Sequence, residues 1–316
     1  MSPRSLAGLG RALATHLGGF VLAILGAALL LQLLLSLAPG DAADLVAGDP
    51  DLRAALVQSW GLDRPVWSRT LTWLSAMLGG DWGMSLTTRP GTPVAELVAR
   101  SSACSAPVLA GSLMLSLSLS VLLSWKRWTL VSRGLSLTSV LPVFLLAAAA
   151  IVGANEVTFA GIQAGRWSAP AWFALPVVDH PLRTALAVLC LGLGSSAFSE
   201  MHQESVEALE RLRRAPFVLA ARARGASLTP ILLRNLALPL SGLVARRAAF
   251  FVGGLVVIEK VLQIQGAGAL LWQACRQRDW PLVVGLSLVA AVVVAGTRLA
   301  ADLFRLALDP RLRAAQ

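Results

Sequence analysis

The sequence predicts an all-α, polytopic membrane protein with about six transmembrane helices and one short cytoplasmic helix. Apolar residues make up 56% of the 316 positions, charged residues make up 14%, and the mean hydropathy is +0.70. A soluble domain carries roughly 25% charged residues. Apolar runs of membrane-spanning length recur along the chain, and short basic segments separate them. Composition and pattern therefore both indicate a chain embedded in a lipid bilayer.

The net charge of +10 does not indicate binding to nucleic acid. Many of the Lys and Arg residues fall in short segments between apolar runs and do not form one patch. The positive-inside rule places such segments on the cytoplasmic side of a membrane. We therefore expect a multi-pass membrane protein and no nucleic-acid partner.

The N-terminal segment, residues 1–41, is predicted to hold a tail and the first span, at about residues 17–37. Arg4 and Arg11 precede this span, which favours a cytoplasmic N-terminus. The apolar run is longer than that of a secretory signal peptide, and Pro39 follows it directly. We therefore expect the first helix to be retained.

Residues 42–100 form the longest polar stretch and are predicted to be external, because their acidic and basic residues nearly balance. Trp60, Trp67, Trp73 and Trp82 suit helices that lie at a membrane–water interface. Three roles remain open for this region: a lid over a pathway, a contact for an external protein, or a spacer.

Residues 101–316 are predicted to hold five further spans. We place them at about residues 103–124, 134–153, 182–199, 238–258 and 282–304. Pro142 predicts a kink in the third span, and an outer loop is expected at 154–181.

A polar segment follows the fourth span. Glutamates recur there at helical spacing and arginines follow them: Glu200, Glu204, Glu207, Glu210, Arg211, Arg213 and Arg214. Glu207 with Arg211, and Glu210 with Arg214, are i,i+4 pairs in the stabilising order. The fourth helix is therefore predicted to continue into the cytoplasm as a stalk, within a cytoplasmic loop region at residues 200–235.

Residues 216–225 are predicted to form a separate short helix after the stalk. Pro216 suits the first helical position, because its missing N–H would be unpaired there. Gly225 suits the position after the last turn, because glycine adopts a positive φ at little cost. Such a helix has about nine residues and a length of roughly 13 Å, so it is too short to span a bilayer. Its place on the cytoplasmic side favours contact with a partner.

The motifs around this helix resemble those of binding-protein-dependent ABC importer permeases, and most closely those of the first permease of the dipeptide/oligopeptide/nickel class. Phe217-Val218 is followed by Ala221-Arg222-Ala223-Arg224-Gly225, and Leu238-Pro239 comes downstream. Further motifs occur in the family's order along nearly the whole chain: Leu37-Ala38-Pro39-Gly40-Asp41, Gly80-Asp81-Trp82-Gly83-Met84-Ser85-Leu86, Glu259, Gly266-Ala267-Gly268, Arg278-Asp279-Trp280-Pro281 and Leu308-Asp309-Pro310-Arg311.

The resemblance implies a multi-pass permease subunit of the cell inner (plasma) membrane, with both termini cytoplasmic, that serves an ATP-driven importer for peptides or similar small solutes. It also implies three kinds of partner: a second homologous permease subunit, two ATPase subunits and an external solute-binding protein. The ATPase-coupling role falls on Pro216, Phe217, Val218, Ala221, Arg222, Ala223, Arg224 and Gly225. Closure of the ATPases would move the stalk through this coupling helix and switch the pathway between inward- and outward-facing states.

The sequence departs from the family at the fifth span, where Arg246 and Arg247 lie inside the apolar run. In one interpretation, one arginine lines the pathway while the other pairs with Asp302. In the alternative, both side chains reach the cytoplasmic headgroups. Asp302 is also expected to pair with Arg298, one helical turn before it. A smaller departure is Gln265, which stands where the family has a loop proline.

Chemistry that is missing from the sequence limits the possible functions. No Gly-x-x-x-x-Gly-Lys-[Ser/Thr] phosphate loop occurs, so we expect a transport subunit that is not itself an enzyme. The three cysteines and three histidines are scattered, so we expect no metal and no cofactor. A secondary transporter or channel without an ATPase partner is the alternative function. Carboxylates within the spans are scarce, which disfavours a proton relay of the secondary-transporter type.

Overall fold

The computed structural model describes residues 3–37, 43–47, 49–61, 63–126, 128–137, 141–165 and 181–308. Within these ranges the chain forms helices, turns and an isolated β-bridge between Met84 and Pro93, which confirms the all-α prediction. The motif residues 38–41 and 309–311, and the outer loop beyond residue 165, lie outside the described residues. The helices are α1 (Pro3–Leu37), α2 (Ala43–Val46), α3 (Pro50–Ser59), α4 (Val66–Leu78), α5 (Val94–Lys126), α6 (Thr129–Leu137), α7 (Val143–Gln163), α9 (Pro181–Leu193), α10 (Ser195–Arg213), α11 (Pro216–Ala223), α12 (Leu228–Val261), α13 (Ala267–Arg276) and α14 (Trp280–Leu308).

The described helices include five that are long and apolar enough to cross a membrane: α1, α5, α7, α12 and α14. The bent pair α9–α10 makes a sixth if it is counted as one span. The prediction of about six spans is confirmed.

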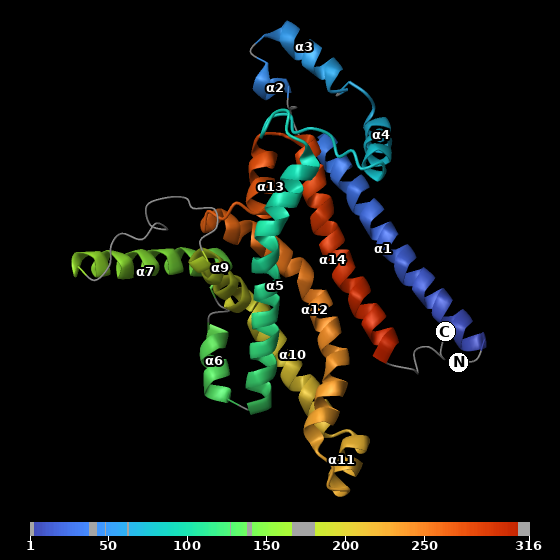
Figure 1. Ribbon diagram of the computed structural model, residues 1–316, viewed down its shortest axis with the longest axis vertical. Helices are drawn as coiled ribbons and strands as arrows, with labels where there is room; N and C mark the ends of the chain where they lie inside the picture. The colour runs from blue at the N-terminus through green and yellow to red at the C-terminus, as the bar shows by residue number, and fades with distance from the viewer. Residues whose placement is uncertain are drawn as a thin grey trace.

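Four of these helices, α1, α5, α12 and α14, run along the long axis of the molecule (Figure 1). α12 packs against α5, α10 and α14, and α14 also packs against α1. The main core lies where α5, α9 and α12 meet, with Val108, Leu191 and Phe251 buried in it. Gly254 permits the close approach of α12 to α9, because a Cβ at this position would lie only 2.7 Å from Cδ1 of Leu191.

The third span differs from the prediction of about 134–153. The helix that crosses this region, α7, begins at Val143 and ends at Gln163, and the first residues of the predicted span belong to the separate helix α6. Pro142 directly precedes α7 and does not kink a longer helix, because proline suits the start of a helix and disrupts its interior. α7 therefore includes the exposed Glu156, and it runs across the long axis in Figure 1.

The fourth span is also interrupted. α9 and α10 meet at an angle of 56°, with Gly194 in extended conformation between them. The stalk prediction is confirmed in that α10 continues to Arg213, and the carboxylate of Glu210 lies 3.9 Å from Arg214. Arg211 instead donates a hydrogen bond to the backbone carbonyl of Glu207 at 3.3 Å.

The fifth span begins about ten residues before the predicted start at residue 238. α12 runs from Leu228 to Val261 and contains Pro239 within it. Its first turns therefore pack beside α10 and α11. Arg246 and Arg247 lie near the middle of this long helix.

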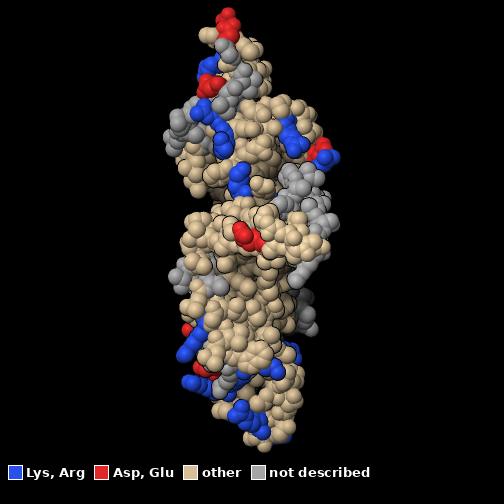
Figure 2. Space-filling model, turned by 90° about the vertical axis from the view of Figure 1, so that its left-hand side faces the viewer, with Lys and Arg blue, Asp and Glu red and all other residues tan. Residues whose placement is uncertain are grey.

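The two ends of the bundle differ. Helices α2–α4 lie at one end, and α11 lies at the other (Figure 1). The start of α1 and the end of α14 lie together on the side of the molecule toward α11 (Figure 1). Nδ1 of His16 in α1 lies 3.3 Å from Asp302 in α14. Asp302 also lies 3.8 Å from Arg305, so the expected pairing of Asp302 with Arg298 or with an arginine of the fifth span was wrong. Figure 2 shows basic and acidic side chains at both ends of the molecule and a largely uncharged middle.

Candidate functional site

The predicted coupling helix is present as α11, which has eight residues, Pro216–Ala223. Pro216 occupies the start of the helix. Gly225 has a φ of +68°, and the N–H of Ala226 donates to the carbonyl of Ala221 at 3.0 Å. These features match the C-terminal cap predicted for glycine at this position. The sequence therefore predicted both ends of this helix within one or two residues.

One face of α11 packs onto the stalk and onto the first turns of α12. Val218 is fully buried and Ala221 is 3% exposed. Val218 shares a hydrophobic cluster with residues of both neighbouring helices: Ala208, Leu209, Leu232 and Leu236. α11 thus packs against α10 and α12 together.

The other face of α11 is open. Phe217 and Leu219 are 47% and 49% exposed, and Arg222 and Arg224 are exposed beside them. Phe217 and Leu219 lie two positions apart and therefore point to different sides of the helix. Exposed aromatic and arginine side chains are typical of a protein-binding surface, where both are enriched.

Arg246 and Arg247 lie against the stalk. Arg246 pairs with Glu204, and Arg247 pairs with Glu200 and, at 3.4 Å, with Glu204. The pairing is possible because glutamates four residues apart on α10 face adjacent arginines on α12. We call these four residues the stalk ion cluster.

A second polar site surrounds Glu259. This residue follows Arg247 by twelve positions on α12, which is about 18 Å along the helix axis. Glu259 is fully buried, and its carboxylate accepts hydrogen bonds from the N–H groups of Gly268 (2.8 Å) and Ala269 (3.0 Å) and from the hydroxyl of Ser105. The Ser105 oxygen in turn accepts the N–H of Ala267 at 2.7 Å. The carboxylate and hydroxyl thereby satisfy the free N–H groups at the start of α13.

The motif Gly266-Ala267-Gly268 is required by this arrangement. A Cβ at position 266 would lie 2.1 Å from Oε1 of Glu259, and one at position 268 would lie 2.6 Å from the Cα of Val256. Sequence reasoning identified the motif but predicted a loop there, and it missed α13.

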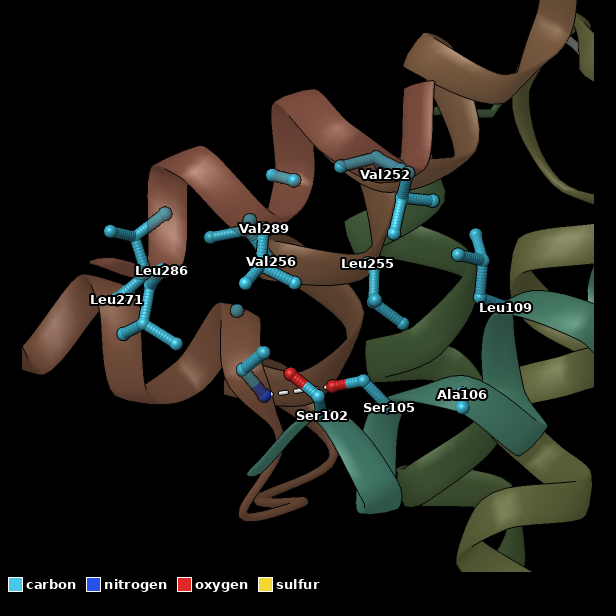
Figure 3. Close-up of a pocket in the computed structure, with 14 residues that line it drawn as sticks. Ser102, Ser105, Ala106, Leu109, Val252, Leu255, Val256, Leu271, Leu286 and Val289 are labelled. Atoms are coloured by element: carbon cyan, nitrogen blue, oxygen red, sulfur yellow. Dashed lines mark hydrogen bonds between the residues drawn. The ribbon is translucent and has the colours of Figure 1, made fainter. Parts of the chain in front are cut away.

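An apolar groove lies directly beside this site (Figure 3). It has a volume of about 160 Å³ and is lined by residues of α5, α12, α13 and α14, among them Ser102, Leu109, Val256 and Val289. None of the lining residues is charged. Arg246 and Arg247 are not among them.

Residues 108–314 match the model of a protein family described as "Binding-protein-dependent transport system inner membrane component". The chain belongs to this family. It is a multi-pass inner-membrane permease component, which confirms the family resemblance, and it is a transport subunit and not an enzyme.

Curated relatives match the permease over nearly its whole length. The "Oligopeptide transport system permease protein AppB" of Bacillus subtilis (strain 168) is 27% identical, over 92% of this chain and 95% of its own. The "Putative peptide permease protein BRA0408/BS1330_II0405" of Brucella suis biovar 1 (strain 1330) is 29% identical, over 92% and 95% of the two chains. The "Glutathione transport system permease protein GsiC" of Salmonella typhi is 26% identical, over 93% and 96%.

Two motifs that the sequence placed far apart meet at the α2–α4 end of the permease. The buried carboxylate of Asp279 accepts hydrogen bonds from the hydroxyl of Ser85 and from the N–H groups of Leu86 (3.2 Å), Thr87 (3.3 Å) and Thr88 (2.9 Å). Asp279 thus fixes the loop that leads into α5, and we call this contact the Asp279 latch. Each motif was recognised in the sequence, but nothing in either one indicated that they form a pair.

Proposed function

We propose that this permease forms half of the membrane pathway of an ATP-driven importer for peptides or similar small solutes, and that it couples to a separate ATPase through α11. The single observation that carries the coupling role is the two-sided packing of α11. Val218 and Ala221 are buried against α10 and α12, while Phe217, Leu219 and the two arginines face outward. A rigid element with an exposed apolar surface suits a partner whose movement must reach the spans.

The solute class follows the printed names of the relatives, which are permeases of oligopeptide, peptide and glutathione transport systems. The apolar groove between α5, α12 and α14 supports a pathway on this face. A second, homologous permease completes the pathway, two ATPase subunits bind at the α11 end, and an external solute-binding protein binds at the α2–α4 end.

Both termini are cytoplasmic in this arrangement. The contact between His16 and Asp302 supports a common side for the beginning of α1 and the end of α14. Six arginines on and around α11 support the cytoplasm as that side: Arg211, Arg213, Arg214, Arg222, Arg224 and Arg234.

Arg246 and Arg247 brace the stalk in this function. Their ion pairs with Glu200 and Glu204 join α10 to α12, so that a displacement of α11 reaches a helix that lines the groove. This bracing role replaces the pathway role that the sequence suggested for one of the two arginines.

Co-purification from detergent-solubilised membranes tests the coupling role. Phe217→Ala and Arg222→Glu should each reduce recovery of the ATPase subunits about tenfold or more, because truncating a central interface residue costs about 2 kcal/mol or more. Leu130→Ala and Arg133→Glu, at exposed positions of α6, are the matched controls and should leave recovery at the parental level. Equal recovery in all four variants would exclude α11 as the main ATPase contact.

A further inference from the structure

The apolar groove has the size of a single side chain. Its volume is about 160 Å³. An apolar protein cavity of about 150 Å³ is large enough to hold benzene. Its walls include Leu109, Val252, Val289 and Val293, and these side chains offer only hydrocarbon surface.

A hydroxyl group in the groove wall has no partner. Oγ of Ser102 is buried and makes no hydrogen bond, and Figure 3 shows Ser102 beside Ser105, next to the start of α13. A buried hydroxyl without a partner costs free energy. Rotation of the Ser102 side chain about χ1 would turn the hydroxyl toward the groove, where an amide or carbonyl group of a solute would give it a hydrogen bond.

The carboxylate of Glu259 lies beside the groove but is not free to bind a charged ligand. Both oxygens of Glu259 are engaged by Ser105 and by the first N–H groups of α13. A ligand in the groove therefore meets a neutral wall. Charge complementarity favours an uncharged group, because a charged one would lose its hydration without gaining a partner.

We propose that this groove is a side-chain pocket that takes one uncharged apolar side chain of a transported peptide, between leucine and a phenyl ring in size, while Ser102 hydrogen-bonds the adjacent peptide group. This inference rests on the proposed function. It names the chemical class of solute that this half of the pathway prefers.

Uptake into proteoliposomes that contain the whole importer tests the size preference, with alanyl-phenylalanine and alanyl-alanine as probes. Ala290→Leu places three extra carbons in the pocket, and it should reduce uptake of alanyl-phenylalanine about tenfold while alanyl-alanine stays within about twofold of the parent. Ser102→Ala should reduce uptake of both peptides about threefold, the effect of one neutral hydrogen bond. Val292→Leu, on the same helix but outside the pocket lining, is the matched control. For Ala290→Leu, equal losses for the two peptides, or no loss for either, would overturn the proposal. For Ser102→Ala, unchanged uptake of both peptides would overturn the role of the hydroxyl.

A labelling experiment measures whether a peptide occupies the pocket, and it does not require transport. Alkylation of Ala290→Cys by N-ethylmaleimide, followed by peptide mass spectrometry, should slow about tenfold with saturating alanyl-phenylalanine and remain unchanged with alanyl-glutamate. Alkylation of Val292→Cys should not respond to either peptide. Equal protection by both peptides, or complete protection without peptide by a lipid chain or the second permease, would refute the side-chain pocket. If the permease were found not to bind ATPase subunits, that result would count against the proposed function alone. The labelling rates would still report whether a peptide occupies the pocket.

Discussion

The carboxylate of Glu259 accepts a hydrogen bond of 2.8 Å from the backbone N–H of Gly268 and thereby fixes where α13 begins. The contact joins the end of a membrane-spanning helix to the start of a short one across a tight turn. A carboxylate is stabilised at this place by the unpaired N–H groups and the partial positive charge of a helix N-terminus. Glycine is needed at position 266, because any Cβ would occupy the space of the carboxylate.

Replacing Glu259 should destabilise the permease. Glu259→Gln puts an amide NH₂ group among N–H donors, and we expect a loss of about 1–3 kcal/mol in the free energy of unfolding. Thermal unfolding in detergent, followed by tryptophan fluorescence, measures the change as a lower Tm. Glu207→Gln, at an exposed position of α10, is the control and should match the parent. An unchanged Tm for Glu259→Gln would mean that the carboxylate does not stabilise α13.

The positive φ of Gly225 leads to a second prediction. A Cβ at this position would meet no atom within 4 Å, so a substitution acts only through the backbone. Gly225→Val should cost about 1–2 kcal/mol, and Gly225→Asn should cost less, because asparagine tolerates a left-handed conformation. Hydrogen exchange at the amides of α11 should therefore be faster in the valine variant than in the asparagine variant. Equal rates in the two variants would contradict a backbone origin.

The stalk ion cluster can be tested by exchanging its charges. Arg247 is 23% exposed in its side chain and pairs with Glu200. Arg247→Glu leaves like charges in contact, so we expect it to lower the Tm, and the double variant Arg247→Glu/Glu200→Arg should recover part of the loss. Arg298→Glu, at an exposed position of α14, controls for the change in net charge. A double variant no more stable than the sum of its single changes would show that the two residues are not coupled.

A stabilising substitution is expected at Gln263, which has a φ of +56° directly after α12. Most residues other than glycine adopt this conformation at a cost of about 1 kcal/mol. Gln263→Gly should therefore raise the free energy of unfolding by roughly 0.5–1 kcal/mol. The neighbouring Gln265→Gly, where φ is not positive, should have the opposite sign because it only adds freedom to the unfolded chain. Denaturant titration of both variants measures the free energy of unfolding. A lower value for Gln263→Gly than for the parent would show that the Gln263 side chain stabilises the fold.

Local patterns in the sequence predicted the parts of the fold that depend on local chemistry. The apolar runs predicted the spans, and Pro216 and Gly225 predicted the ends of α11, because proline and glycine act through their own φ. The predicted kink at Pro142 was wrong for a related reason: a proline inside an apolar run has two interpretations, and only neighbouring helices decide between a kink and a helix start.

Contacts between distant segments were not predictable in this way. The glutamates at positions 200 and 204 were interpreted as a solvated stalk, and Arg246 and Arg247 as an anomaly of the fifth span. The two glutamates and the two arginines form ion pairs with each other, and this pairing depends on how α10 and α12 pack. The apolar groove was missed for the same reason, since four helices contribute to it and each wall residue looks like an ordinary apolar residue of a span.

The Asp279 latch also constrains the order in which the chain matures. Ser85 and Asp279 are separated by 194 positions, and Asp279 immediately precedes the final helix. Until residue 279 has been made, the N–H groups of residues 86–88 can bond only to water, because their protein acceptor is missing. A chain truncated before residue 279 therefore lacks this contact however well its earlier helices have inserted. We expect the loop at 85–88 to be more open to proteolysis in such a truncated chain than in the full chain.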